Sequence, residues 1–157
     1  MPNKPTLRFV KPTLRDITKM IDLVEPEVAS GIILARSEDE IATNIRSYTL
    51  VFDKEELIGF SALHIHTATL AEIRSLIIAQ NYRGQGVGAK LIDHLLQEAQ
   101  TLGVQKVLSL TYQQQFFEKL GFVEIPKESL PEHKIWADCI KCKHFPICNE
   151  VSLIKNL

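Results

Sequence analysis

The octapeptide Tyr82-Arg83-Gly84-Gln85-Gly86-Val87-Gly88-Ala89 joins two runs of different periodicity. An apolar, strand-like run over residues 73–79 leads into it, and a run with helical spacing over residues 87–102 leaves it. A glycine-rich turn before a helix leaves backbone N–H groups without partners, next to the positive end of the helix dipole. Its glycines let the backbone approach a ligand without a Cβ atom in the way. This stretch therefore predicts an anion site that suits a pyrophosphate.

Two other phosphate-binding turns fit the glycine pattern less well. A Rossmann dinucleotide site needs Gly-x-Gly-x-x-Gly close to the chain start, and an acidic residue about 20 residues further on. Here the glycines fall as Gly84-x-Gly86-x-Gly88, midway along the chain and after an apparent antiparallel meander. A Walker A loop needs Gly-Lys-Ser/Thr, which the sequence lacks. A tight turn without a ligand is the structural alternative.

The composition is that of an ordinary folded protein. The 157 residues fit a single domain spanning residues 1–157, and a hydrophobic content of 45% can fill its core. A formal net charge of −1 gives no basis for non-specific binding to nucleic acid or to an anionic membrane. No apolar run reaches the ~20 residues of a transmembrane helix, and no apolar segment of a secretory signal follows Lys4. We expect a cytoplasmic protein.

The hydrophobic pattern predicts one mixed sheet. Strands are expected over residues 7–10, 48–52, 57–66, 69–79, 104–111, 122–125 and 151–154, and helices after residue 13, after residue 37, over 87–102 and over 113–120. The capping box Ser37-Glu38-Asp39-Glu40 opens a helix with Ile41 and Ile45 on one face. Pro26 and Gly31 interrupt the first helix, so residues 25–34 should form a turn and a short helical piece. The fold class is α/β (α+β), a mostly antiparallel sheet of about six or seven strands with helices on both faces.

The order Arg83-x-x-Gly86-x-Gly88 resembles the acetyl-coenzyme A signature of GNAT-superfamily acyltransferases. Residues 116–122, Phe-Phe-Glu-Lys-Leu-Gly-Phe, resemble the helix-to-strand corner that follows the coenzyme site in these enzymes. The resemblance implies a GNAT fold with acetyl-CoA as cosubstrate. The backbone of Leu76, Ile77 and Ile78 would hold the pantetheine arm, and the Ile78 N–H would polarise the thioester carbonyl. The pyrophosphate would be surrounded by Gly84, Gln85, Gly86, Val87, Gly88 and Ala89, with Arg83 either adding charge at the rim or simply solvated.

Further segments resemble the acetyltransferase domain of bacterial N-acetylglutamate synthases. They are Glu25-Pro26, residues 31–37, Leu110-Thr111-Tyr112-Gln113 and Leu130-Pro131-x-x-Lys134-x-Trp136. The chain has no room for the amino-acid-kinase domain of longer members, so the match is to the short form. This resemblance implies acetylation of the α-amino group of L-glutamate, at the first step of arginine biosynthesis.

Glutamate as acceptor needs cations for its two carboxylates, and its ammonium must lose a proton before attack. Arg36, before a predicted helix, and Arg74, on the strand before the glycine loop, are the expected carboxylate clamps, with Lys134 a further candidate. Each of the three has a surface salt bridge as its alternative. Glu72 matches the acidic residue that serves such synthases as general base, acting through a water. Its alternative is a strand carboxylate paired with Arg74 on the same face.

The proton donor to the departing thiolate stays open. Many GNAT enzymes use a tyrosine, but register with residues 116–122 puts Phe117 at that position. Tyr112, where long-form synthases carry an arginine, could be the acid or a substrate contact. A coenzyme A thiolate could equally leave unassisted.

Cys139-x-x-Cys142-x-His144-x-x-x-Cys148 gathers three thiols and one imidazole. Zinc accepts such a set, but a structural site normally joins two pairs across a longer loop. We therefore favour reduced thiols without metal, with a redox pair at Cys139 and Cys142 as a third option. His64 and His66 share a strand face without a third ligand nearby, and we expect them to be ordinary strand residues.

These observations predict an enzyme whose partners are acetyl-CoA and an amino acid, and whose sheet edges allow a homodimer. Two alternatives stay open. The acceptor could be another amino acid such as glutamine, a polyamine or a protein N-terminus. The chain could also be a non-catalytic sensor of acetyl-CoA.

Overall fold

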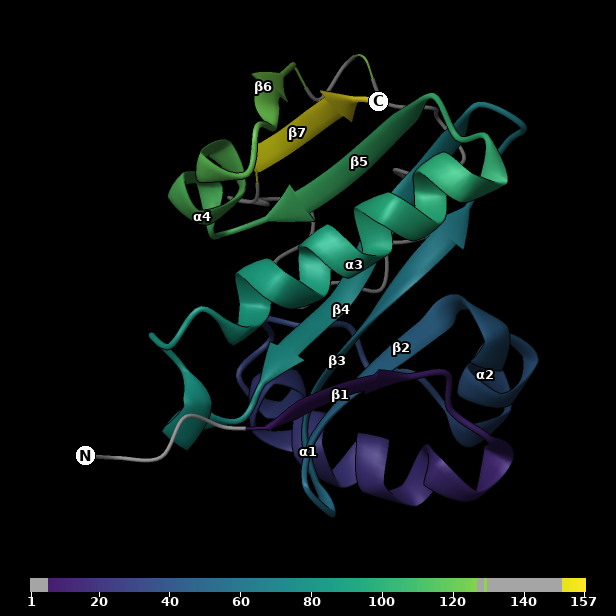
Figure 1. The fold of residues 1–157 in the computed structure, drawn as a ribbon, viewed down its shortest axis with the longest axis vertical. Helices are drawn as coiled ribbons and strands as arrows, with labels where there is room; N and C mark the ends of the chain where they lie inside the picture. The colour runs from purple at the N-terminus through teal and green to yellow at the C-terminus, as the bar shows by residue number, and fades with distance from the viewer. Residues whose placement is uncertain (1–5, 127–128, 130–150) are drawn as a thin grey trace.

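A computed structural model describes residues 6–126, 129 and 151–157. In these residues seven strands form one sheet, in the order β1-β2-β3-β4-β5-β7-β6 (Figure 1). The strands are β1 (Leu7–Val10), β2 (Tyr48–Asp53), β3 (Glu56–Ile65), β4 (Leu70–Ile78), β5 (Lys106–Thr111), β6 (Val123–Ile125) and β7 (Val151–Asn156). The helices are α1 (Ile17–Ala29), α2 (Glu38–Thr43), α3 (Val87–Leu102) and α4 (Gln114–Lys119), with 3-10 turns η1 (Leu14–Asp16), η2 (Ile45–Ser47) and η3 (Gln80–Tyr82).

The sheet is mixed, as the sequence predicts. Neighbouring strands pair antiparallel except β4 and β5, which run parallel. A two-residue turn, Lys54-Glu55, joins β2 to β3, with Lys54 at a φ of 57°. Such a short connection suits an antiparallel hairpin, so the predicted hairpin is confirmed.

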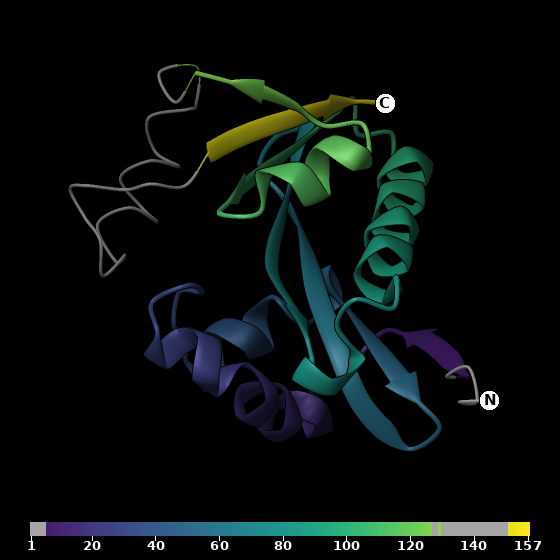
Figure 2. The same cartoon turned by 90° about the vertical axis from the view of Figure 1, so that its left-hand side faces the viewer.

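Helices cover both faces of the sheet. In Figure 2, α1 and α2 lie on one side of the strands and α3 and α4 on the other. The face of α3 that meets the sheet carries Leu91, Ile92, Leu95 and Ala99, all fully buried. On the opposite face, Met20 of α1 and Ile41 of α2 pack with Tyr48, Leu50 and Phe60. Both cores follow from the 3.6-residue spacing of the helices and the two-residue spacing of the strands.

Several element limits are confirmed. The strand at Leu7–Val10 and the helix at Val87–Leu102 have the predicted bounds. Gly103 ends α3 with a φ of 89°, a left-handed conformation that glycine adopts without a Cβ penalty. The capping box at Ser37 is formed, because Ser37 Oγ accepts from Glu40 N and the Glu40 carboxylate accepts from Ser37 N. No helix among residues 6–126 and 151–157 is both long and apolar enough to cross a bilayer.

The prediction for residues 25–34 is wrong in its first half. Helix α1 continues through Pro26 to Ala29, and Ser30 N then donates to Pro26 O at the helix end. Proline removes one N–H from a helix interior, but Ile21 and Val24 of α1 pack into the core beside it and hold the helix. Ile45 is also misplaced, because α2 ends at Thr43 and Ile45 lies in η2.

Candidate active site

The strand β4 contains a bulge near the point where its pairing with β5 ends while its pairing with β3 continues. The β3–β4 register shifts between Phe60 and Ala62, and Ser75 opposite has a φ of 55°, unusual for a residue with a Cβ. The Ser61 hydroxyl donates to Arg74 O at 2.9 Å and satisfies that carbonyl beside the bulge. The bulge turns β4 away from β5, whose pairing with it ends at Ile73↔Ser109.

Beyond Ile73, β4 runs on to Ile78 with one edge not paired to β5. On the other edge, Ala79 N donates to Ile58 O at 2.7 Å. Backbone groups of an antiparallel strand alternate between its two edges, so the Ile78 N–H points away from β3 and toward the β5 side. This edge can hydrogen-bond an extended ligand as an added strand would.

The glycine loop leads from β4 into α3. Gly84 and Gly86 have φ values of 76° and 82°, and Gly86 is the N-terminal cap of α3. A Cβ at either position would meet no atom within 4 Å, so the backbone conformation, not space, demands glycine there. The sixteen-residue helix α3 directs its dipole and its first N–H groups at this loop.

Gly88 has a different reason to be glycine. A Cβ there would lie 3.3 Å from Cζ of Phe116, in α4, and 3.7 Å from Cγ1 of Ile78. The first turn of α3 is therefore pressed against α4. This contact joins the two segments, 82–89 and 116–122, that stand apart in the sequence.

Two side chains of the loop are tied to distant elements. Arg83 donates from Nε to Ile78 O at 2.9 Å and from Nη2 to Glu27 Oε1, in α1, at 2.6 Å. It is anchored as well as half-exposed, and its added role at a pyrophosphate stays a prediction. The Tyr82 hydroxyl donates to Asp53 Oδ2 at 2.6 Å, and this hydrogen bond raises the pKa of Tyr82 to about 12. The loop is thereby fixed to the β2–β3 turn.

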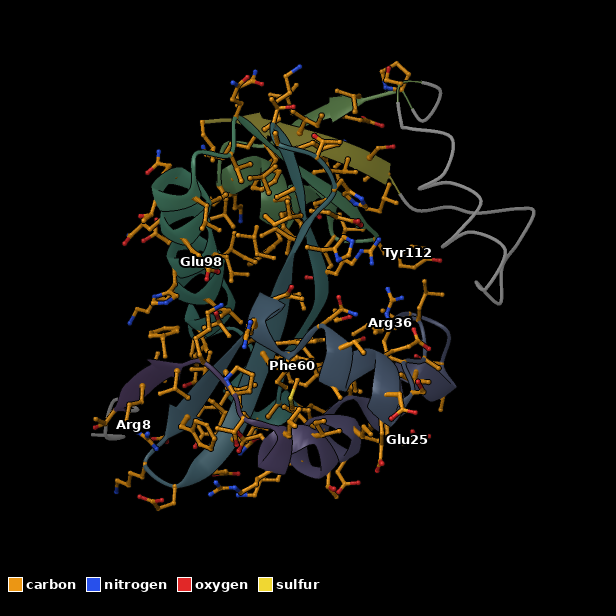
Figure 3. The ribbon with its side chains drawn as sticks, turned by 90° about the vertical axis from the view of Figure 1, so that its right-hand side faces the viewer. Arg8, Glu25, Arg36, Phe60, Glu98 and Tyr112 are labelled. Carbon is orange, nitrogen blue, oxygen red and sulfur yellow. The ribbon has the colours of Figure 1, made fainter. Side chains whose placement is uncertain are left out.

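A pocket of about 120 Å³ opens where β4 and β5 diverge. Its lining includes five site residues predicted from the sequence: Arg36, Glu72, Arg74, Leu76 and Tyr112. Figure 3 shows Arg36, from the segment before α2, and Tyr112, after the end of β5, on the same side of the molecule. Phe117 also lines the pocket, packs edge-on against Phe122, and has no proton to donate. Folding therefore brings Arg36, Glu72, Arg74 and Tyr112 to one pocket, whereas Ile78 does not line it.

Glu72 is nearly fully buried and shares one oxygen between two partners. Its Oε1 lies 2.8 Å from Arg74 Nε and 2.8 Å from His66 Nε2. The predicted pairing with Arg74 is present, and the role of Glu72 as base stays a prediction. The expectation that His66 is an ordinary strand residue is wrong, because it follows β3 and contacts Glu72. The β3–β4 register pairs His64 with Glu72, and His66, two residues further on, then reaches the Glu72 side chain; no local sequence signal sets that register.

Tyr48 is a second residue that the sequence analysis missed. It is buried in a smaller apolar pocket of about 70 Å³, which shares Arg36 and Ser75 with the larger one. Burial raises the pKa of the Tyr48 phenol, although Arg36 and Arg74 nearby act to lower it. Tyr48 therefore places a neutral phenol within reach of the charges of both arginines. Nothing in its local sequence distinguishes it from a core strand residue.

Some predicted residues lie outside the described part of the chain. They are Lys134 and the cysteine cluster Cys139, Cys142, His144 and Cys148. Among residues 6–126 and 151–157, no three side chains of His, Cys, Asp or Glu gather as metal ligands would.

Comparison with known proteins gives a family match, one relative matched over nearly its whole length and others matched over about a quarter of theirs. A sequence model of the Acetyltransferase (GNAT) family matches residues 17–122. An uncharacterised N-acetyltransferase of Chlorobaculum tepidum is 35% identical over 144 residues, which is 92% of this chain and 92% of that protein. An amino-acid acetyltransferase of Vibrio cholerae is 32% identical over 125 residues, 78% of this chain but 28% of that protein.

Solved structures share the fold. The chain is similar to the N-acetylglutamate synthase of Neisseria gonorrhoeae complexed with coenzyme A and N-acetyl-glutamate, with a TM-score of 0.86 and 22% identity. That match covers 99% of this chain and 36% of the other. A Mycobacterium tuberculosis protein in complex with CoA and NLQ gives a TM-score of 0.80 at 23% identity, covering 98% and 99% of the two chains. The expected fold is confirmed.

Because Gly86 has a left-handed conformation, replacing it should change the stability of the fold. We expect Gly86→Ala to lower the free energy of unfolding by about 1–2 kcal/mol, because a Cβ disfavours a positive φ. Gly86→Asn is the matched control, since asparagine tolerates this conformation better, and it should lose clearly less. Urea unfolding of the two variants measures the difference. Equal losses would contradict a conformational requirement at this position.

Proposed function

The chain belongs to the acetyltransferase (GNAT) family, and we propose that it transfers acetyl from acetyl-CoA to the α-amino group of L-glutamate. One observation carries the proposal. Arg36 and Arg74 line one pocket together with Glu72, beside the edge of β4 that β5 leaves unpaired. The protein would act as a single cytoplasmic domain and would supply N-acetylglutamate for arginine biosynthesis.

The geometry supports acetyl-CoA as the cosubstrate. Leu76, Ile77 and Ile78 would pair with the pantetheine arm along the open edge of β4, through backbone groups alone. The loop of residues 83–89 would hold the pyrophosphate at the N-terminus of α3. The N. gonorrhoeae and M. tuberculosis proteins with this fold were each solved with coenzyme A, which agrees with the assignment.

The charges of the pocket support an anionic acceptor. Arg36 has 16% of its side chain exposed and Arg74 has 17%, so a carboxylate bound to either would be largely shielded from water. Arg36 Nη1 lies 3.9 Å from Glu40 Oε2 of the following helix, α2. Polyamine acceptors would need an acidic groove in place of these guanidinium groups. The similarity of this chain to the amino-acid acetyltransferase of V. cholerae is consistent with an amino-acid substrate.

The proposed chemistry is direct attack within a ternary complex. Glu72 accepts a proton from the acceptor ammonium through a water, and the amine nitrogen then attacks the thioester carbon. The Ile78 N–H donates to the oxyanion of the tetrahedral intermediate. Collapse breaks the C–S bond and releases the coenzyme A thiolate, and the attacking nitrogen loses its second proton to solvent to give the amide. That thiolate is protonated either by Tyr112 or by solvent.

The acceptor is tested by coenzyme A release from acetyl-CoA. We expect L-glutamate to give the highest kcat/KM in a panel with L-glutamine, spermidine and a short peptide, because it alone offers two carboxylates. Faster turnover of another amine would refute the acceptor assignment but not the coenzyme site. Binding of acetyl-CoA without turnover of any amine would instead favour a sensor.

Arg36 gives a test of the acceptor pocket. Arg36→Gln should raise KM for glutamate about 10- to 100-fold, since a hydrogen bond to a charged group contributes about 1.5–3 kcal/mol. KM for acetyl-CoA should hardly change. Arg46→Gln, an exposed arginine in η2, is the matched control and should resemble wild type. Steady-state kinetics with each substrate varied would show whether the loss is confined to glutamate.

Glu72 gives a test of the base. Glu72→Gln keeps the side-chain shape and an oxygen that can accept from Arg74 and His66, but removes the basic carboxylate. We expect kcat to fall about 100- to 10,000-fold, and its dependence on pH to change. A variant with the pH–rate profile of wild type would remove this role from Glu72.

A further inference from the structure

We infer that His66 is a positioning residue for the proposed reaction, which holds the carboxylate of Glu72 ionised and oriented when Arg74 turns to the acceptor. This role rests on the proposed acetyl transfer. It begins from one geometric fact: two nitrogens, Arg74 Nε and His66 Nε2, each lie 2.8 Å from the same oxygen of Glu72.

The shared oxygen matters because of burial. The Glu72 side chain is 4% exposed and the His66 side chain 5% exposed. A carboxylate taken out of water loses its solvation and stays ionised only if nearby donors or cations replace it. The two contacts to Oε1 contribute to that replacement and fix the position of this oxygen.

Arg74 has two tasks in the proposed reaction. It pairs with Glu72 and lines the acceptor pocket, where it is expected to bind a carboxylate of the substrate. Any turn of its guanidinium toward the substrate weakens its bond to Glu72. His66 does not line the pocket, so its bond to Glu72 need not compete with the substrate. With His66 as a second donor, Arg74 can bind the substrate carboxylate while Glu72 keeps a hydrogen bond.

Hydrogen bonds of the backbone hold the turn that carries His66, and a neighbouring ring packs against its imidazole. His66 N and Thr67 N both donate to Leu70 O, at 2.9 and 3.1 Å, and Leu70 N donates to Thr67 Oγ1 at 3.0 Å. These bonds close the turn between β3 and β4. The His64 ring packs edge-on against the His66 ring, with 4.8 Å between centroids. Such support from backbone and neighbouring side chains is what a positioning residue needs.

An ionised Glu72 also implies the tautomer of His66. An ionised carboxylate oxygen only accepts hydrogen bonds, so the 2.8 Å contact requires a proton on Nε2 of His66. Through that proton, His66, at the end of β3, donates to Glu72 independently of Arg74, which lies on the same strand as Glu72. Glu72 would then present a fixed basic oxygen to the water or amine in the pocket.

The first test compares His66→Gln, which can keep an N–H donor at the Nε2 position, with His66→Leu, which cannot. We expect His66→Leu to lower kcat about tenfold or more and His66→Gln to retain most of it, with KM for acetyl-CoA unchanged in both. His94→Leu is the matched control, because His94 is an exposed imidazole on α3 that stacks on Phe9. It should behave as wild type.

A double-mutant cycle separates positioning from packing. If His66 acts through Glu72, the variant with both Glu72→Gln and His66→Leu should have the kcat of Glu72→Gln alone. An equal fold-loss from His66→Leu in both backgrounds would overturn the inference, as would equal kcat values for His66→Gln and His66→Leu.

A readout without turnover keeps this inference distinct from the proposed function. Nitrogen-15 NMR of the imidazoles should show the Nε2-protonated tautomer of His66 in wild type. The Nδ1-protonated tautomer would overturn the inference even in an active enzyme. If that spectrum is as expected but no amine is acetylated, the acceptor assignment fails and the catalytic role of His66 fails with it.

Discussion

The structure depends on the fact that β4 cannot pair with both neighbours along its whole length. It is bonded to β3 as far as Ile78, but to β5 only as far as Ile73. The extra residue at Ser75, held in a left-handed conformation, produces this divergence. An open backbone edge, a pocket between two strands and the approach to the glycine loop all follow from that one irregularity.

The bulge also exchanges the two faces of β4. Before it, Glu72 and Arg74 face the side of α1 and α2, while Ala71 and Ile73 lie in the core beneath α3. After it, the apolar Ile77 takes the α1 side. A one-residue insertion reverses which side chains point to each face. Polar residues therefore end at the pocket, and the apolar core resumes beyond it without a buried charge.

The charged groups around the pocket are coupled to one another. Glu72 forms an ion pair with Arg74, and a bound substrate carboxylate would interact with the same guanidinium. The second donor, His66, comes from a turn whose backbone is closed by its own hydrogen bonds. The proposed base, the proposed acceptor clamp and the hairpin turn are joined by hydrogen bonds, so substituting one of them should alter the others.

Local signals in the sequence determined much of this protein. The capping box at Ser37, the helical face that starts at Val87 and the glycine at residue 103 act within a few residues, so their pattern is legible without a structure. The glycine loop is local in the same sense, since a positive φ and an exposed helix start need no distant partner. Pro26 shows the limit of such reasoning, because packing of α1 against the core overrode a local helix breaker.

Tertiary structure alone decided which of these residues meet. Arg83 bonds Glu27 across 56 positions, and Arg36 reaches the pocket of Arg74 from a different element. His66 meets Glu72 through a hairpin register that alternation by itself does not set. Side-chain type and spacing report the chemistry a residue can perform. The bulge, the strand order and the packing of α1 determine which partners stand within hydrogen-bond reach, because those distances are set by the whole sheet.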